Sequence, residues 1–369
     1  MSLAPALPRV LPTDLEAQRY ELARARQLAR AWAETLPEPR RRDMAAVFTR
    51  VAIDTYQADA RPHAKLSPPF AKPYGRLDRA VADIAEAVGR EAAPLPIAEA
   101  VYFLTGLYTT LLHARERGAL GAFYTPPALA NRLLDMAEEQ GVDWTRARVL
   151  DPASGGGAFL LPAAERMIAA LPAAEPAIVL RQIGTRLLGL EMDPYAAGFG
   201  QNAVELLLAD VTSAAGRAAP IVVRVADTLE EAPAARFDLV IGNPPYGRVT
   251  LTPEQRLRFA RGLYGHANLY GVFTDIAVRW TKKGGTIAYL TPTSFLSGHY
   301  YSALRELIAK EAPPVAIDFV HARRGVFEDV LQETLLAVYK RGAKPGRAQI
   351  HYVEVTNERE ARLIRNGTI

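Results

Sequence analysis

From about Gly121 to Lys340, the chain repeats one pattern: a short apolar run, a turn, and then an amphipathic segment of helix length. Apolar runs that predict strands cover residues 148–150, 187–190, 221–225, 237–242, 286–290, 315–319 and 334–339. Helical spacing is clearest at residues 158–170, 194–208 and 269–280. Strands that alternate with helices predict a mostly parallel sheet with helices on both faces. We therefore expect an α/β fold for this part of the chain.

The first hundred residues show helical spacing and no convincing strand pattern. Helices are expected at residues 16–36, 44–56, 77–90 and 96–113, so residues 1–115 are predicted to form a helical N-terminal region. Pro37 and Pro39 are expected to end the first helix. The arginines of this region, including Arg40 to Arg42, are expected to form a solvated helix face rather than a nucleic-acid patch.

Composition excludes several kinds of chemistry. The 369 residues contain no cysteine, which rules out disulfides, thiolate nucleophiles and cysteine-ligated zinc. The formal net charge of +4 permits an anionic partner without requiring one. No apolar run approaches the roughly 18 residues of a membrane span, and the N-terminus does not resemble a secretory signal. We therefore expect a cytoplasmic protein with no membrane partner.

A glycine-rich loop follows the first expected strand, in the run Asp-Pro-Ala-Ser-Gly-Gly-Gly-Ala-Phe at residues 151–159. Glycines allow a sharp turn and a close approach of the backbone to a ligand. The loop lacks both the Lys-Ser/Thr ending of a phosphate-binding loop and the spacing of a dinucleotide-binding loop. Asp151 stands where a carboxylate can face a ligand's ammonium group, although a plain tight turn is the alternative.

Acidic residues end the next two expected strands. Glu191 ends the second, where an acid can bind both hydroxyls of a ribose, although it lies 40 residues after Asp151 rather than the usual 20 or so. Asp227 ends the third and can accept a hydrogen bond from an adenine amine. A surface carboxylate and a turn cap are the respective alternatives. Together the three acids favour a positively charged ligand that contains ribose, and S-adenosylmethionine fits better than a dinucleotide.

The tetrapeptide Asn243-Pro244-Pro245-Tyr246 follows the fourth expected strand. Its two prolines fix φ and carry no N–H, so their carbonyls remain as acceptors beside the amide oxygen of Asn243. This rigid loop suits the two hydrogens of an amino group, and Tyr246 offers a flat surface for stacking. A proline turn capped by an asparagine is the alternative.

Taken together, these motifs resemble the N6-adenine DNA methyltransferases of restriction-modification systems, in the group whose cofactor motifs precede the catalytic tetrapeptide. That family has an upstream motif of the type Phe-Tyr-Thr-Pro, which matches residues 123–126. Its glycine-rich motif, DPACGSGxFL, appears here as DPASGGGAFL, with Ser154 and Gly156 at the variable places. A later motif with a base-stacking Phe resembles Gly325-Val326-Phe327. The similarity covers roughly residues 121–340.

The resemblance implies a Rossmann-like S-adenosylmethionine-dependent methyltransferase fold, with a catalytic domain over residues 116–345. The residues it implies for cofactor binding are Tyr124, Thr125, Asp151, Ala153, Ser154, Gly155, Phe159, Glu191, Met192, Asp227, Thr228 and Asn243. The implied catalytic group is Asn243, Pro244, Pro245 and Tyr246. Tyr246 and Phe327 are expected to stack on a flipped base, with an ordinary core aromatic as the alternative for Phe327.

The expected reaction needs neither a metal nor a covalent intermediate. The Asn243 oxygen and the Pro244 carbonyl would hold both hydrogens of the adenine amine and direct its lone pair at the methyl group. Because a base inside a duplex cannot reach such a pocket, the adenine must flip out. Arg248, Arg323 and Arg324, with Arg256, Arg258 and Arg261 nearby, are candidates for neutralising DNA phosphates, although scattered surface arginines are common.

The family usually carries a DNA-reading domain after the catalytic core, but only 29 residues follow Lys340. Residues 346–369 are therefore expected to be a C-terminal tail or the start of a missing target-recognition domain. Double-stranded DNA is the expected substrate, with a separate specificity or restriction subunit as a second partner. The alternatives are a methyltransferase that acts on a protein glutamine or an RNA base, and a catalytically silent fragment that binds cofactor or DNA.

Overall fold

A computed structural model describes residues 12–119, 125–232, 237–263, 265–298, 301–322, 334–357 and 359–368. Within these ranges, nine strands form one sheet in the order β3-β2-β1-β4-β5-β7-β6-β8-β9. They are β1 (Val149–Asp151), β2 (Leu187–Glu191), β3 (Val223–Val225), β4 (Phe237–Gly242), β5 (Thr281–Pro292), β6 (Pro314–Ala322), β7 (Thr334–Lys340), β8 (Gln349–Asn357) and β9 (Glu360–Thr368).

The sheet is parallel from β3 to β5 and mixed beyond it. β7 runs antiparallel to both of its neighbours, β5 and β6, whereas β8 pairs parallel with β6 and antiparallel with β9. The strand order changes direction at β1, because β2 and β3 extend to one side of it while β4 and β5 extend to the other. Ligands of open α/β sheets bind at such a switch point, outside the carboxyl ends of the strands.

Helices cover both faces of this sheet, as expected. The described helices of the α/β part are α6 (Pro127–Glu139), α7 (Leu160–Ala169), α8 (Pro176–Arg186), α9 (Pro194–Leu207), α10 (Ala209–Ala215), α11 (Pro253–Arg258), α12 (Leu269–Trp280), α13 (Ser294–Ser297) and α14 (Ser302–Glu311). Successive strand residues point to opposite faces. Val149 and Leu239 therefore pack with α6, α7 and α8, whereas Leu150 and Val240 pack with α12 and α14.

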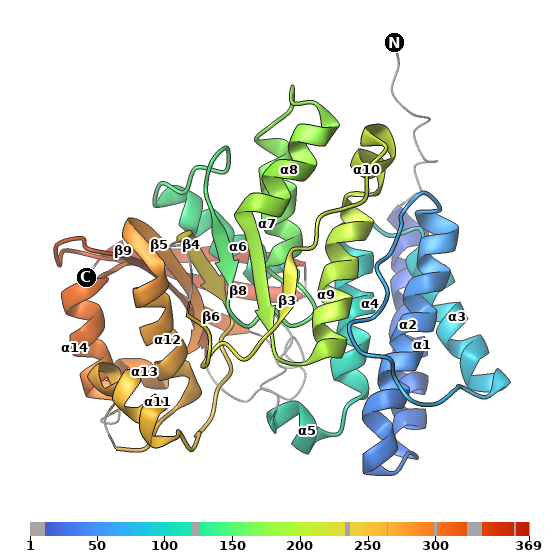
Figure 1. Ribbon diagram of the computed structural model, residues 1–369, viewed down its shortest axis with the longest axis horizontal. Helices are drawn as coiled ribbons and strands as arrows, with labels where there is room; N and C mark the ends of the chain where they lie inside the picture. The colour runs from blue at the N-terminus through green and yellow to red at the C-terminus, as the bar shows by residue number, and fades with distance from the viewer. Residues whose placement is uncertain are drawn as a thin grey trace.

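The N-terminal helices form a bundle beside the sheet (Figure 1). They are α1 (Pro12–Glu34), α2 (Glu38–Ala60), α3 (Arg79–Ala92), α4 (Ile97–Leu111) and the short α5 (Ala114–Ala119). Helix α9 lies between the bundle and the sheet. Its Ala197 and Val204 join the core of the sheet, while Phe199 and Ala203 join the core of the bundle. Every residue from 196 to 206 is buried, so the bundle and the sheet share one helix.

Two details of the N-terminal region differ from expectation. The first helix ends ahead of Pro37 and Pro39, as expected, but α2 begins at Glu38 rather than at residue 44: Pro37 is its N-cap and Pro39 lies in its first turn, where a missing N–H has no cost. The arginines were expected to be solvated. Arg41 is instead buried and donates to the Leu111 carbonyl oxygen at 2.7 Å, and Arg42 pairs with Asp193 at 3.1 Å.

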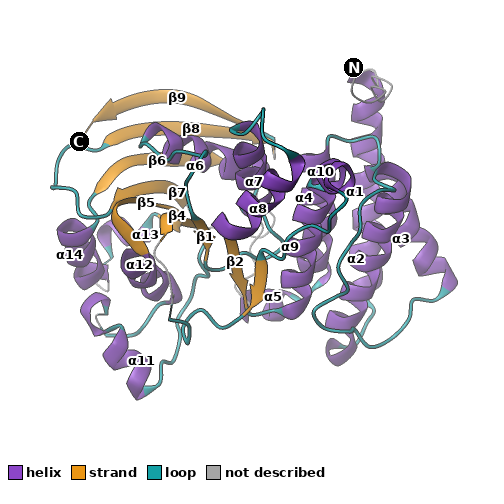
Figure 2. Cartoon of the chain, turned by 45° about the horizontal axis from the view of Figure 1, so that its top comes forward, coloured by secondary structure: helices purple, strands orange, loops and turns teal. Residues whose placement is uncertain are grey.

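The expectation of a tail or a separate domain start for residues 346–369 does not match the structure. Residues 349–368 form β8 and β9, which extend the sheet at its far edge (Figure 2). Ile350, Val353 and Val355 are buried, and this burial of apolar side chains explains why the segment pairs with β6. None of the described helices is both long and apolar enough to cross a membrane.

Candidate active site

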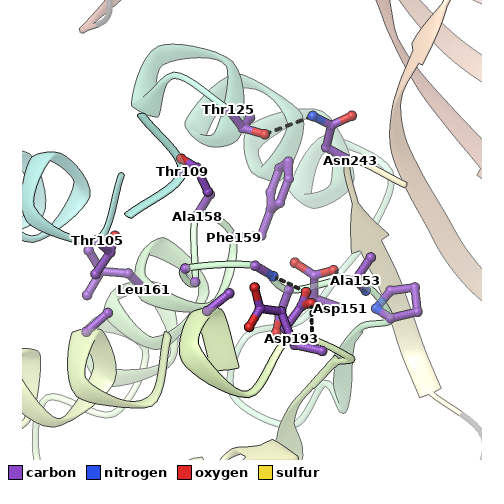
Figure 3. Close-up of a pocket in the computed structure, with 18 of the residues that line it drawn as sticks. Thr105, Thr109, Thr125, Asp151, Ala153, Ala158, Phe159, Leu161, Asp193 and Asn243 are labelled. Atoms are coloured by element: carbon purple, nitrogen blue, oxygen red, sulfur yellow. Dashed lines mark hydrogen bonds between the residues drawn. The ribbon is translucent and has the colours of Figure 1, made fainter. Parts of the chain in front are cut away.

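A cavity of about 340 Å³ opens at the carboxyl ends of the parallel strands, where the strand order changes direction (Figure 3). Most of the residues predicted for the site line it: Thr125, Asp151, Ala153, Ser154, Gly155, Phe159, Glu191, Met192, Asp227, Thr228, Asn243 and Pro245. Residues separated by more than a hundred positions in sequence thus share one pocket. Tyr124, Arg323, Arg324 and Phe327 lie outside the described residues.

The glycine-rich loop is held in place by its own backbone and by helix α9. Gly155 and Gly157 adopt positive φ values of 50° and 89°, which side chains rarely tolerate. The Ser154 N–H donates to the Leu190 carbonyl oxygen at 2.9 Å, which ties the loop to β2. Gly200 of α9 packs so closely that a Cβ built on it would lie 2.9 Å from the Gly155 oxygen. The loop therefore has little room to move.

Asp151, at the end of β1, is a buried carboxyl group. It is 1% exposed and accepts a hydrogen bond from the Ala153 N–H at 3.1 Å. Burial raises its pKa to about 8, with a smaller contribution from nearby Glu191. In the described part of the chain, no cationic side chain forms an ion pair with Asp151. A buried carboxyl group that has no protein cation suits the ammonium group of a ligand.

The raised pKa of Asp151 predicts that binding of a ligand ammonium group beside it depends on pH. If S-adenosylmethionine places its ammonium group there, it favours the ionised carboxylate, so its binding should release a proton below pH 8. We expect affinity to rise with pH between about 5.5 and 7, by up to about tenfold per unit. Calorimetry in buffers of different ionisation enthalpy measures both the affinity and the proton release. Asp151→Asn is the control and should bind with a shallower pH dependence; equal affinity of the wild type across this range would contradict the prediction.

Glu191 ends β2 with both of its oxygens already oriented by the backbone. Oε2 accepts from the Gly155 N–H at 2.9 Å, and Oε1 accepts from the Asp193 N–H at 2.8 Å. Burial raises the pKa of this carboxyl group. A carboxylate oxygen has two acceptor positions, so each oxygen can still accept a hydrogen bond from a ligand hydroxyl. This geometry fits the two hydroxyls of a ribose.

Asp227 and Thr228 follow β3 and line the same cavity. The Asp227 carboxylate accepts from the Leu229 N–H at 2.9 Å, so it caps a turn, which was the alternative considered for it. The Thr228 hydroxyl donates to the Pro152 carbonyl oxygen at 2.6 Å and joins this turn to the glycine-rich loop. Turn capping uses one oxygen of Asp227, and the other remains a possible acceptor for a ligand amine.

Asn243 projects from the end of β4 into the cavity. Its Nδ2 donates to the Thr125 Oγ1 at 3.1 Å (Figure 3), and its Oδ1 accepts from the Tyr246 hydroxyl at 2.5 Å. The first contact joins the tetrapeptide to Thr125, which lies 118 positions earlier in the chain. Pro245 lines the cavity, whereas Pro244 is buried.

Tyr246 is not among the residues that line the cavity. Its ring packs against the hydrophobic cores on both faces of the sheet, and its hydroxyl also donates to the Leu290 carbonyl oxygen at 3.3 Å. Burial raises the pKa of the Tyr246 phenol. To stack on a substrate ring, the Tyr246 side chain would have to rotate towards the cavity.

The candidate DNA-binding arginines differ in their surroundings. Arg248 is exposed just after the tetrapeptide, next to its backbone partner Asn268. Arg258 donates to the Leu229 carbonyl oxygen at 2.8 Å, and Arg261 pairs with Asp275 at 2.6 Å. Arg258 and Arg261 therefore hold the protein together at this edge. In the described ranges, no three histidine, aspartate or glutamate side chains gather as a metal site.

Helix α4 also contributes to the cavity, which the motifs did not predict. Tyr102, Thr105, Tyr108 and Thr109 line the cavity from the N-terminal region. A Cβ on Gly156 would lie 3.1 Å from the Cβ of Thr105, so α4 packs directly on the glycine-rich loop. The available signal was a row of hydroxyl-bearing residues at helical spacing on a helix that is otherwise apolar.

The strand order and the position of the cavity are those of an α/β methyltransferase fold. A class I S-adenosylmethionine-dependent methyltransferase from Listeria monocytogenes superposes with a TM-score of 0.55 and 13% identity, over 93% of this chain and 95% of its own. The fold is thus that of the class I S-adenosylmethionine-dependent methyltransferases, as the motifs predicted, and S-adenosylmethionine is the cofactor that the comparisons support.

The sequence comparisons find similarity to one group of proteins. Residues 223–327 match the Eco57I restriction-modification methylase family. The type II methyltransferase M.TthHB8I of Thermus thermophilus is 31% identical over 204 residues, which are 52% of this chain and 39% of the relative. M.PaeR7I of Pseudomonas aeruginosa is 29% identical over 227 residues, or 58% and 39%. The chain is thus similar in sequence to restriction-modification methylases, in agreement with the resemblance noted in its motifs, and it spans about two fifths of the length of these two proteins.

Proposed function

We propose that this chain carries the catalytic part of a DNA methyltransferase that modifies the N6 amine of a flipped-out adenine in a specific sequence. The observation that carries the proposal is the position of Asn243, which lines the same cavity as the acids Asp151 and Glu191. An acceptor-rich loop for an amine thus adjoins a pocket suited to the cofactor. The relatedness to restriction-modification methylases supports DNA as the substrate.

The cavity residues fit S-adenosylmethionine. Asp151 would hold the ammonium group, because it is a buried carboxyl group in need of a cation. Glu191 would accept from the ribose hydroxyls with the lone pairs that Gly155 and Asp193 leave open. Asp227 would accept from the adenine amine. When bound, the cofactor supplies an electrophilic methyl group.

The tetrapeptide would hold and orient the substrate amine. The lone pair of an aromatic amine is delocalised into the ring, so the nitrogen is a weak nucleophile. Two acceptors, the Asn243 oxygen and the Pro244 carbonyl, would bind both amine hydrogens and localise the lone pair towards the methyl group. Catalysis of this kind depends on orientation and fixed dipoles rather than on a general base.

Binding of the amine requires a change at Tyr246. The Asn243 oxygen now accepts from the Tyr246 hydroxyl, so the substrate amine has to replace that donor. Rotation of the freed Tyr246 side chain would place its ring beside the base, where a stacking contact contributes roughly 1–3 kcal/mol. Phe327 is the second stacking residue in this proposal, and Arg248, Arg323 and Arg324 would contact the phosphates of double-stranded DNA. Sequence reading would come from further protein, either another domain or a separate specificity subunit.

A labelled-methyl transfer assay tests the proposed function. Purified protein is mixed with tritiated S-adenosylmethionine and with duplex DNA of varied sequence, RNA or protein, and the acceptors are digested for nucleoside and amino-acid analysis. We expect label in N6-methyladenine from DNA. Label in methylcytosine, in RNA or in protein glutamine would contradict the proposal, and so would cofactor binding without transfer to any acceptor.

A further inference from the structure

A buried hydrogen-bond network connects the N-terminal helices to the cofactor acids. Asp193, which is 2% exposed, accepts from the Tyr108 hydroxyl at 2.6 Å and pairs with the Arg42 guanidinium at 3.1 Å. Arg42 also donates to the Tyr108 oxygen at 3.2 Å. Because Arg42 lies on α2 and Tyr108 on α4, two helices of the bundle meet at one carboxylate that follows β2.

The same aspartate sets the position of Glu191. The backbone N–H of Asp193 donates to the Glu191 Oε1 at 2.8 Å, and the Asp193 side chain caps α9 by accepting from the Tyr195 N–H at 2.9 Å. The Tyr195 hydroxyl bonds to Asp43 of α2, and the Arg42 guanidinium lies 5.7 Å from the centroid of the Tyr195 ring. A displacement of Asp193 would therefore move one of the two N–H groups that orient the Glu191 carboxylate.

The chemistry of the network favours a fixed geometry. A buried carboxylate is costly unless it is paired and hydrogen-bonded, and Asp193 obtains its cation from Arg42 and a neutral donor from Tyr108. Burial and the adjacent carboxylate raise the pKa of Tyr108, so the phenol keeps its proton and acts as the donor. Loss of either partner would leave the buried Asp193 carboxylate without one of its donors, so that the side chain would be free to change its position.

We propose that Tyr108 and Arg42 are positioning residues of the cofactor site, which act through Asp193 to hold Glu191 in the orientation that binds the ribose. The inference rests on the proposed cofactor role of Glu191. It gives the N-terminal bundle a function, because residues of α2 and α4 then set cofactor affinity. Tyr108 also lines the cavity, so its action through Glu191 has to be separated from a direct contact with the cofactor.

A double-mutant cycle makes this separation. The variants are Tyr108→Phe, Glu191→Gln and their combination, and calorimetry measures the affinity for S-adenosylmethionine and S-adenosylhomocysteine. We expect Tyr108→Phe to weaken binding of both ligands about tenfold in the wild-type background and less than about twofold in the Glu191→Gln background.

Tyr56→Phe is the matched control. Tyr56 is a buried tyrosine of the same helical core, 1% exposed, and it does not line the cavity. Its variant should bind the cofactor as the wild type does, with thermal unfolding used to check that both variants fold. If Tyr108→Phe fails to fold, Arg42→Gln tests the other partner of Asp193. Arg42→Gln should also weaken cofactor binding less in the Glu191→Gln background than in the wild-type background.

The outcomes separate the inference from the site assignment on which it rests. An equal loss of affinity in both backgrounds would mean a direct contact or general damage and would overturn the inference, as would an equal loss in Tyr56→Phe. If Glu191→Gln weakens binding while Tyr108→Phe and Arg42→Gln do not, only the positioning role is wrong. If Glu191→Gln leaves affinity unchanged, the cofactor role of Glu191 is wrong as well.

Discussion

Replacement of Asn243 with alanine is expected to lower methyl transfer by roughly a hundred- to a thousandfold, because it removes an acceptor that orients the reacting amine. The affinity for S-adenosylmethionine should stay within about threefold, since the acids proposed to hold the cofactor lie on other strand ends. Single-turnover kinetics with duplex DNA, together with calorimetry of cofactor binding, measure the two effects separately. Near-wild-type turnover would remove the proposed mechanism.

Asn131→Ala is the matched control for this prediction. Asn131 is an asparagine on α6 that lines the same cavity, and its Oδ1 accepts from Arg166 at 2.9 Å rather than facing the tetrapeptide. Its variant should transfer methyl groups at a rate within a few-fold of the wild type. If Asn131→Ala lost as much activity as Asn243→Ala, the loss would reflect disruption of the cavity and not the loss of the amine acceptor.

Replacement of Gly200 with alanine is expected to have the second large effect. The added Cβ would lie 2.9 Å from the Gly155 oxygen and 3.3 Å from the Gly157 nitrogen, both of which are backbone atoms of the glycine-rich loop. The loop has to shift, which should cost about 1–3 kcal/mol of stability. It should also weaken cofactor binding roughly a hundredfold, because the loop lines the cavity proposed to hold the cofactor. Thermal unfolding and calorimetry measure the two losses.

Gly198 provides the control on the same helix. A Cβ there would meet only Phe70 and Pro69 backbone atoms, at 3.6 and 3.9 Å, which are ordinary contacts. Gly198→Ala should therefore keep cofactor affinity and gain up to about 1 kcal/mol of stability, because alanine favours a helix more than glycine does. Equal behaviour of the Gly198 and Gly200 variants would mean that helix packing in general, and not the approach to the loop, sets the effect.

The strand ends could be predicted from the sequence because parallel strands place their carboxyl ends at one edge. The bounds of β4 and α12 match the expected ranges, and the acids Asp151, Glu191 and Asp227 meet in one cavity. In these segments, local apolar spacing and tertiary packing favour the same structure. Alternation of short strands and turns was therefore sufficient to locate the pocket.

The side of the cavity that α4 lines could not be predicted from the sequence in the same way. Thr105 and Thr109 look like polar interruptions of an apolar helix, and their role depends on contact with a loop about fifty residues later in the chain. The inward position of Tyr246 depends equally on long-range packing, because its hydroxyl bonds to a carbonyl of β5. The pairing of β8 with β6 is another long-range choice. Sequence periodicity reports local structure and carries no information on such partners.

The burial of residues 196–206 of α9 limits which parts of this fold can be exchanged between proteins. A helix with no solvent-facing side has to match two neighbours at once, so its residues must change in concert with the bundle and with the sheet. Exchange of the first hundred residues between related methylases would therefore require that α9 travel with them. Chimeras that exchange the first hundred residues without α9 would leave apolar side chains exposed between the bundle and α9, and they would aggregate.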